Sequence, residues 1–261
     1  MRSLDKSELK NEDEIYLWGQ DAGLYEKFTT MERIDKIIEL VHRYSFGNKI
    51  LDVGCAQGNT SLLLAEKGFD SVALDLNNNF LNYARKKHER GSVSYVCANA
   101  MNMPFEYGEF DAVILGEIIE HAAYPEKILK EAKRCLKKNG LLIITTPNRH
   151  LFSGVLSGYR PPLYEKIGKK QKKEMKSRQF GPGGKDHLYV FNLKCLEKFT
   201  SSQKLSTIEK GYMGSCFINK FTYSVLRVFP GFFLRLVDKF LANFPGINKN
   251  FSIGVYTACR K

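Results

Sequence analysis

The sequence of 261 residues predicts an α/β fold in which a mostly parallel β-sheet carries helices on both faces. Three observations carry this prediction. Between residues 47 and 148, short apolar runs alternate with stretches of helical spacing. Two of these runs, Phe110–Gly116 and Leu141–Pro147, are almost continuously apolar, as is typical of parallel strands buried on both faces. A third, Ile50–Gly58, leads directly from an apolar strand into a turn that contains two glycines.

Residues 1–46 are expected to form a helical segment that precedes the sheet. Ile34, Ile37, Ile38 and Val41 recur there at helical spacing and define one apolar face. The first residues of the chain lack the apolar core of a signal peptide. Six cysteines occur singly, with no pair spaced for zinc or for a redox dithiol, which is typical of a reducing compartment. A cytoplasmic location is therefore expected.

The regular alternation breaks after residue 148. Residues 149–191 are rich in glycine, proline and basic residues, and are expected to form a loop or a small insertion. The remainder, 192–261, is expected to complete the sheet. It has a helical pattern over 192–202 and strand patterns over 206–211 and 251–258.

Charge and hydrophobicity are unevenly placed in this second half. The chain carries 40 Lys and Arg against 28 Asp and Glu, a formal net charge of +12, which favours acidic partners such as nucleic acid, anionic lipid or phosphorylated small molecules. Much of the excess lies in 160–178, although such a run is most often a solvated segment. The apolar stretch 217–244 is interrupted by charges and a proline, so it cannot span a membrane. It could form a cap over a hydrophobic substrate, a dimer contact, an interfacial segment that touches lipid, or simple packing on the core. A cap or packing is favoured over peripheral membrane contact, and the oligomeric state stays open.

Two acids at the ends of successive strands indicate a cofactor that contains a nucleoside. Asp52 ends the first apolar run, and Asp75 ends a second run about twenty residues later, where a carboxylate commonly binds ribose hydroxyls. A dinucleotide would require the spacing G-x-G-x-x-G, but the three positions hold Gly54, Ala56 and Asn59. A nicotinamide-dependent oxidoreductase is therefore disfavoured.

The segment Ile50–Gly58 resembles motif I of the class I S-adenosylmethionine-dependent methyltransferases, in particular the type 11/23 group. The resemblance extends over about residues 47–148. It implies a Rossmann-like, doubly wound, seven-stranded sheet, mostly parallel with an antiparallel last strand, together with a helical N-terminal lid (1–46) and an inserted cap. It also implies that S-adenosylmethionine is the cofactor and is held by Arg33, Asp52, Gly54, Cys55, Ala56, Gly58, Asp75, Leu76, Asn99, Ala100, Gly116 and Glu117.

Three of these residues receive specific roles from the resemblance. Asp75 would bind the ribose hydroxyls, so its replacement by alanine is expected to weaken cofactor binding with little loss of stability. Asn99 stands where most relatives carry Asp, and its amide would contact the adenine amino group. Arg33 would face the methionine carboxylate, although a surface position on an amphipathic helix explains it equally well.

A group of acids and a histidine follows the run Phe110–Gly116. In a helical turn Glu117, Glu120 and His121 would share one face, and such a set suits Mg²⁺ or Mn²⁺. The pattern Glu-x-x-Glu-His resembles the O-methyltransferases of ubiquinone biosynthesis and the small-RNA 3′-terminal ribose methyltransferases. The latter take a further histidine from a later segment, a position that His187 matches here. His150 is a spare candidate.

The resemblance implies methyl transfer from S-adenosylmethionine, most plausibly to a hydroxyl oxygen of a small or lipid-like molecule. Without a metal, His121 or His187 would act as the general base. Two alternatives stay open: a metal-assisted RNA ribose methyltransferase, and a non-catalytic nucleic-acid-binding module built on the same fold.

Overall fold

The computed structural model describes residues 24–148, 163–168, 171, 173, 187–215, 236, 240 and 252–261, with side chains described from Thr30 onward. Most of the basic run 160–178 and of the apolar stretch 217–244 falls outside these residues. So do residues 1–23 and His150.

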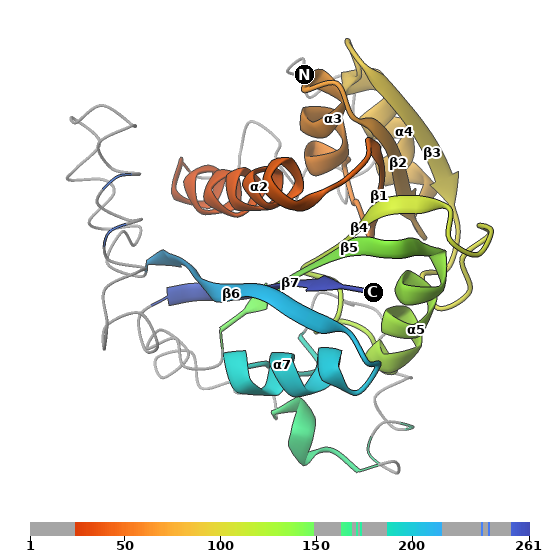
Figure 1. Ribbon diagram of the computed structural model, residues 1–261. Coiled ribbons are helices and arrows are strands. Elements are labelled where there is room, and N and C mark those ends of the chain that lie inside the picture. Colours follow the sequence, from red (N-terminus) through yellow and green to blue (C-terminus); the bar gives the residue numbers. More distant parts are fainter. Residues whose placement is uncertain are drawn as a thin grey trace.

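A seven-stranded sheet forms the centre of the molecule, with the strand order β3-β2-β1-β4-β5-β7-β6 (Figure 1). The first five strands are parallel to one another, and β7 runs antiparallel to both β5 and β6. This is the doubly wound sheet with an antiparallel last strand that the sequence predicts. The strands are β1 (Lys49–Val53), β2 (Asp70–Asp75), β3 (Ser92–Cys97), β4 (Phe110–Gly116), β5 (Leu136–Pro147), β6 (Ser206–Ser215) and β7 (Ser252–Arg260).

Helices cover both faces of the sheet, as Figure 1 shows. They are α2 (Leu24–Tyr44), α3 (Asn59–Glu66), α4 (Asn78–Lys87), α5 (Pro125–Cys135) and α7 (Leu193–Ser201), and Tyr164–Lys166 adds a short 3-10 helix. The residues expected to form the apolar face of the first helix are all buried: Ile34, Ile37, Ile38 and Val41. Of the helices that the structure describes, none is long and apolar enough to cross a membrane.

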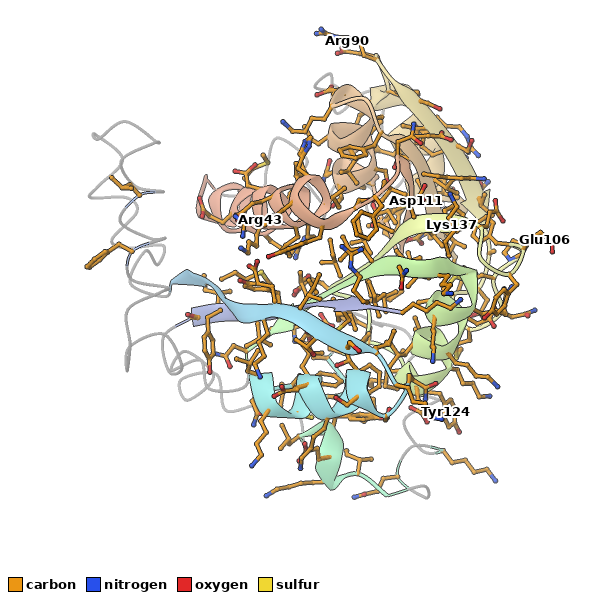
Figure 2. The ribbon with its side chains drawn as sticks, in the orientation of Figure 1. Arg43, Arg90, Glu106, Asp111, Tyr124 and Lys137 are labelled. Atoms are coloured by element: carbon orange, nitrogen blue, oxygen red, sulfur yellow. The ribbon has the colours of Figure 1, made fainter. Side chains whose placement is uncertain are left out.

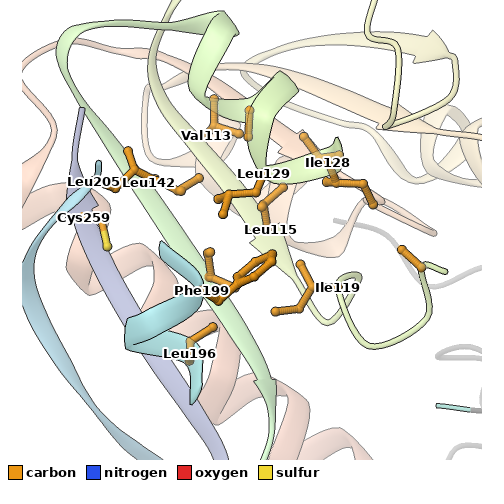
Figure 3. Packing of buried hydrophobic residues seen from close by; sticks show 14 of the residues in the cluster. Val113, Leu115, Ile119, Ile128, Leu129, Leu142, Leu196, Phe199, Leu205 and Cys259 are labelled. Atoms are coloured by element: carbon orange, nitrogen blue, oxygen red, sulfur yellow. The ribbon is translucent and has the colours of Figure 1, made fainter. Parts of the chain in front are cut away.

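Alternate residues of the central strands divide the core into two layers, because successive side chains of a strand point to opposite faces. Ile114 and Ile143 pack with α2 on one face. Val113, Leu115 and Leu142 pack on the other face against α5 and α7 (Figure 3). Burial on both faces explains why β4 and β5 read as continuous apolar runs.

Two strands are longer than predicted. Strand β5 begins at Leu136 instead of Leu141, and β6 continues from Gly211 to Ser215. The added start of β5 contains exposed polar residues, so its composition does not indicate a strand. It is joined to β4 by the pairing of Leu136 with Phe110 and by Lys137, whose Nζ lies 2.9 Å from Asp111 Oδ1 (both labelled in Figure 2).

Candidate functional site

A cavity of about 680 Å³ lies at the carboxyl ends of β1, β2 and β4, within the size range of small-ligand sites. Eleven of the twelve residues expected to hold the cofactor line it, and Gly58 is the exception. The lining residues from the expected set are Arg33, Asp52, Gly54, Cys55, Ala56, Asp75, Leu76, Asn99, Ala100, Gly116 and Glu117. Helix α2 thus forms part of the wall, next to the strand ends.

The turn after β1 contains three residues in the left-handed conformation: Gly54 (φ 70°), Ala56 (φ 47°) and Gly58 (φ 71°). A Cβ at Gly54 would lie 2.6 Å from Ile118 Cδ1, so this glycine lets the turn pass close to the segment after β4. A Cβ at Gly58 would lie 2.8 Å from Ala84 Cβ on α4. Gly58 therefore serves the packing of the turn on α4 and does not line the cavity.

Asp75 holds this turn in place. Its Oδ2 accepts the backbone N–H of Ala56 at 2.8 Å, and its Oδ1 accepts that of Asn77 at 2.8 Å. Burial raises the pKa of Asp75, and these backbone bonds oppose the rise. These two bonds give Asp75 a structural role, so we predict that its replacement by alanine costs more stability than the sequence suggests. Each carboxylate oxygen can accept a second hydrogen bond, so a ribose contact stays compatible with this geometry.

Asp52 lies behind the turn and is almost fully buried. Ser61 Oγ donates a hydrogen bond of 2.6 Å to Asp52 Oδ2. Burial raises the pKa of Asp52 to about 6; the Ser61 bond opposes this rise, and the charge of Asp75 adds to it.

Asn99 is already engaged within its own loop. Its Oδ1 accepts the backbone N–H of Met101 at 2.9 Å, which fixes the chain around Ala100 at the cavity wall. A second lone pair of the amide oxygen is left for a ligand.

The segment 117–121 is not the helical turn expected from its spacing. Glu117 has a left-handed φ of 55°, and a tight turn closes where His121 N–H donates to Ile118 O at 3.1 Å. Glu117 faces the cavity, where its Oε2 lies 3.8 Å from Arg33 Nη1. Its Oε1 is buried and has no hydrogen-bond partner among the described residues. An acid and an arginine therefore stand side by side in the cavity wall.

Glu120, His121 and His187 form a compact cluster at the far side of the same turn. One ligand atom from each lies within 4.8 Å of the others, and the two imidazole rings meet edge to face at 4.8 Å. His121 Nε2 lies 3.9 Å from Glu120 Oε1, and His121 also lines the cavity. The backbone N–H of Leu188 donates to Glu120 O at 2.8 Å, which keeps the segment of His187 beside the turn. The expected four-residue metal set is thus corrected to three, because Glu117 is not a member.

The carboxyl of Glu120 is the buried end of this cluster. Its Oε2 accepts Thr146 Oγ1 at 3.1 Å, whereas Oε1 is buried without a hydrogen-bond partner in the described part of the chain. Burial, and next the charge of Glu117, raises the pKa of Glu120 well above its ordinary value. An orphaned oxygen facing two imidazoles fits a divalent cation. Two nitrogen donors and one oxygen suit Mn²⁺ or a later transition metal better than Mg²⁺.

Comparisons with known proteins relate the part of the chain that forms this site to methyltransferases. A family described as "Methyltransferase domain" matches residues 51–144, which hold both the turn and the cluster's first two members. Over these residues the chain matches a methyltransferase domain. A ubiquinone biosynthesis O-methyltransferase from Actinobacillus pleuropneumoniae serotype 7 (strain AP76) is 29% identical over 161 residues, 58% of this chain and 68% of that protein. The biotin biosynthesis bifunctional protein BioHC from Cellvibrio japonicus (strain Ueda107) is 26% identical over 131 residues, 49% of this chain and only 26% of that protein.

Solved structures extend the likeness of fold beyond the methyltransferase domain itself. The magnesium protoporphyrin IX methyltransferase from Synechocystis PCC 6803, with bound SAH, has a TM-score of 0.60 and covers 95% of this chain and 92% of its own. At 13% sequence identity the likeness concerns the fold alone.

Sequence reasoning missed several residues that line the cavity. Gln57 and Asn59 line it, although they lie within or next to the recognised turn. Phe80 and Met101 follow the acid of β2 and the expected adenine segment by a few residues. Gln57 lies inside the recognised turn, and extending the motifs by one to four residues would have found the other three. No pattern in the sequence distinguishes Lys87, which contacts the turn from behind, from the exposed basic residues beside it.

Proposed function

We propose that the protein transfers a methyl group from S-adenosylmethionine to a hydroxyl oxygen of a small or lipid-like acceptor. One observation carries the proposal. The cavity that bears the cofactor motif is also lined by His121, which joins Glu120 and His187 directly behind the wall. The likeness to an O-methyltransferase of ubiquinone biosynthesis supports oxygen as the accepting atom.

The cavity offers complementary groups to each part of this cofactor. Glu117 Oε1 lacks a partner among the described residues and would accept the ammonium of the methionine part, and Arg33 beside it would bind the carboxylate. Asp75 and the Asn99 loop also line the cavity, and they would contact the ribose and the adenine. Bound there, S-adenosylmethionine supplies a methyl group on a positively charged sulfur.

The residues of the chain then have two tasks: to align the acceptor oxygen and to remove its proton. Alignment of the reacting atoms contributes up to ~7–11 kcal/mol to such reactions. His121 reaches the cavity and would take the proton, with Glu120 and His187 holding its ring. A general base of this kind contributes about 10²–10⁴-fold. The alternative to this base is a divalent ion held by Glu120, His121 and His187, which would lower the pKa of an acceptor hydroxyl and fix its orientation in place of proton removal by His121.

The test uses radiolabelled S-adenosylmethionine and extract from the source cells, followed by partition into lipid, small-molecule, RNA and protein fractions. We expect label in the lipid or small-molecule fraction. His121→Ala should lower it by about 10²-fold or more, and His42→Ala, an exposed histidine on α2, should not. Label confined to RNA would replace the proposal by the ribose methyltransferase alternative. Cofactor binding without label in any fraction would indicate the non-catalytic module.

A further inference from the structure

Lys87 is a buried cation with an unusual set of partners. It is the last residue of α4, and only 3% of it is exposed. Its Nζ donates to Asn59 Oδ1 at 2.5 Å and reaches Gln57 O at 3.5 Å, and the ring of Tyr83 lies 5.0 Å away. All of these partners are neutral. A buried ammonium is normally paired with a carboxylate, because removing its charge from water is unfavourable.

The charged neighbours of α4 do not compensate this burial. The helix packs against β2 and β3, and Lys87 reaches α3 through Asn59. Burial alone lowers the pKa of Lys87 to about 8, with no contribution from any acid. The titratable side chains of these elements are Arg85 and Lys86 on α4 beside Tyr83, Glu66 on α3, Asp70 and Asp75 on β2, and Tyr95 and Cys97 on β3. The charged form of Lys87 is thus kept in the fold at a cost in stability, which points to a role in binding.

The two groups that Lys87 contacts belong to the cofactor cavity. Gln57 and Asn59 both line it, and they flank Gly58, which takes a positive φ that glycine adopts readily. The Gln57 carbonyl lies 3.5 Å from Lys87 Nζ, and the N–H of the preceding residue, Ala56, donates to Asp75 Oδ2 at 2.8 Å. A carboxylate and an ammonium therefore both bind backbone groups of the same turn.

We propose that Lys87 is a positioning residue that holds the 57–59 wall of the cavity in the conformation that binds S-adenosylmethionine. The inference rests on the proposed function, since it assumes that this cofactor occupies the cavity. Its hydrogen bonds are strongest while the amine is charged, because charge-assisted hydrogen bonds are about twice as strong as neutral ones. Cofactor affinity should then fall as Lys87 loses its proton, whereas folding stability should rise, because the cost of burying the charge disappears.

The test compares the wild type with Lys87→Met, which keeps the length and removes the charge, and with Lys86→Met, the exposed neighbour on the same helix. Calorimetry gives the Kd for S-adenosylhomocysteine between pH 6.5 and 9.5, and thermal unfolding gives Tm at each pH. At pH 7 we expect Lys87→Met to bind about tenfold more weakly with an unchanged or higher Tm. Lys86→Met should match the wild type. The α-amino group of the ligand titrates in the same range, so the difference between the wild-type and Lys87→Met profiles is the informative quantity.

The wild type should lose its affinity advantage over Lys87→Met as the pH rises through about 8. Equal affinities at all pH values, or a loss of affinity that follows a loss of Tm, would overturn the assignment. If Lys87→Met does not fold, Asn59→Asp gives a second test. A carboxylate beside the amine should keep Lys87 charged to higher pH, so the pH at which cofactor affinity falls should increase. If that pH stays the same as in the wild type, the inference is contradicted. If the wild type binds neither S-adenosylmethionine nor S-adenosylhomocysteine, the proposed function itself fails, and this assignment with it.

Discussion

Replacing Asp75 by alanine should destabilise the protein as well as weaken cofactor binding. The carboxylate accepts two backbone N–H groups at 2.8 Å, one from Ala56 and one from Asn77. Hydrogen bonds to a charged acceptor contribute about 1.5–3 kcal/mol each. Water in the cavity would partly satisfy the freed N–H groups, so we take the lower value for each bond. The loss is then about 3 kcal/mol, or ~6 °C in Tm for a chain of this length.

Urea unfolding and thermal unfolding measure this loss, and calorimetry measures cofactor affinity on the same samples. Asp70→Ala is the matched control, because Asp70 begins the same strand and, among the described residues, its side chain accepts a single exposed bond, from Ser92 Oγ at 2.8 Å. It should cost less than about 1 kcal/mol. An Asp75→Ala protein with the Tm of the wild type and reduced affinity would refute the reasoning, since a ribose contact alone would then explain the residue.

Three further predictions concern the same region. Gly58→Ala should lower the free energy of unfolding, measured in urea, by about 2–4 kcal/mol, because Gly58 has a left-handed φ and its new Cβ would lie only 2.8 Å from Ala84 Cβ. Gly68→Ala is the control: it has the backbone strain but no neighbour within 4 Å, and should cost about 1–2 kcal/mol. Equal losses for the two variants would show that the contact with Ala84 does not contribute. Asp52 has a folded pKa of about 6, above its unfolded value, so its contribution to stability should fall by about 2–3 kcal/mol as the pH rises from 4 through 6. Asp52→Asn lacks this titration, so the difference in unfolding free energy between the wild type and Asp52→Asn should change by the same amount over this pH range. A difference that stays constant with pH would contradict the raised pKa of Asp52. Mn²⁺ or Zn²⁺ at a hundred times its Kd should raise the free energy of unfolding of the metal-free protein by about 2.7 kcal/mol, and His187→Ala should abolish this increase. If neither ion changes the unfolding free energy of the wild type, the cluster does not bind a metal.

The strands of the sheet were predictable because burial leaves a direct trace in composition. β4 and β5 are buried on both faces and read as unbroken apolar runs. The start of β5 was not predictable, because Lys137 is exposed there and pairs with Asp111 across the strand ends. Strand pairing in such a segment depends on its neighbour and not on its own residues.

The candidate site shows a similar division. The positions that line the cavity follow from the strand ends, where a parallel sheet gathers its polar residues. The arrangement of the metal-ligand candidates does not, because the i, i+3, i+4 argument assumes a helix and Glu117 leaves the helical region. A left-handed glutamate carries no signal in the sequence. The partnership of Lys87 with Asn59 was equally hidden, since it depends on how two helices pack and not on spacing along one of them.

The position of β7 has a consequence for how the chain folds. β7 lies between β5 and β6 and is the only strand that β6 pairs with in the described sheet. Its pairing with β5 joins residues more than a hundred positions apart, for example Leu141 with Arg260. Strands β1 to β5 can assemble as each emerges during synthesis, but β6 must wait, unpaired, for the later strand. Contacts of such long range slow folding and leave exposed strand edges that favour aggregation. The interval before β7 docks is therefore the stage at which a chaperone or a low growth temperature should most improve the yield of folded protein.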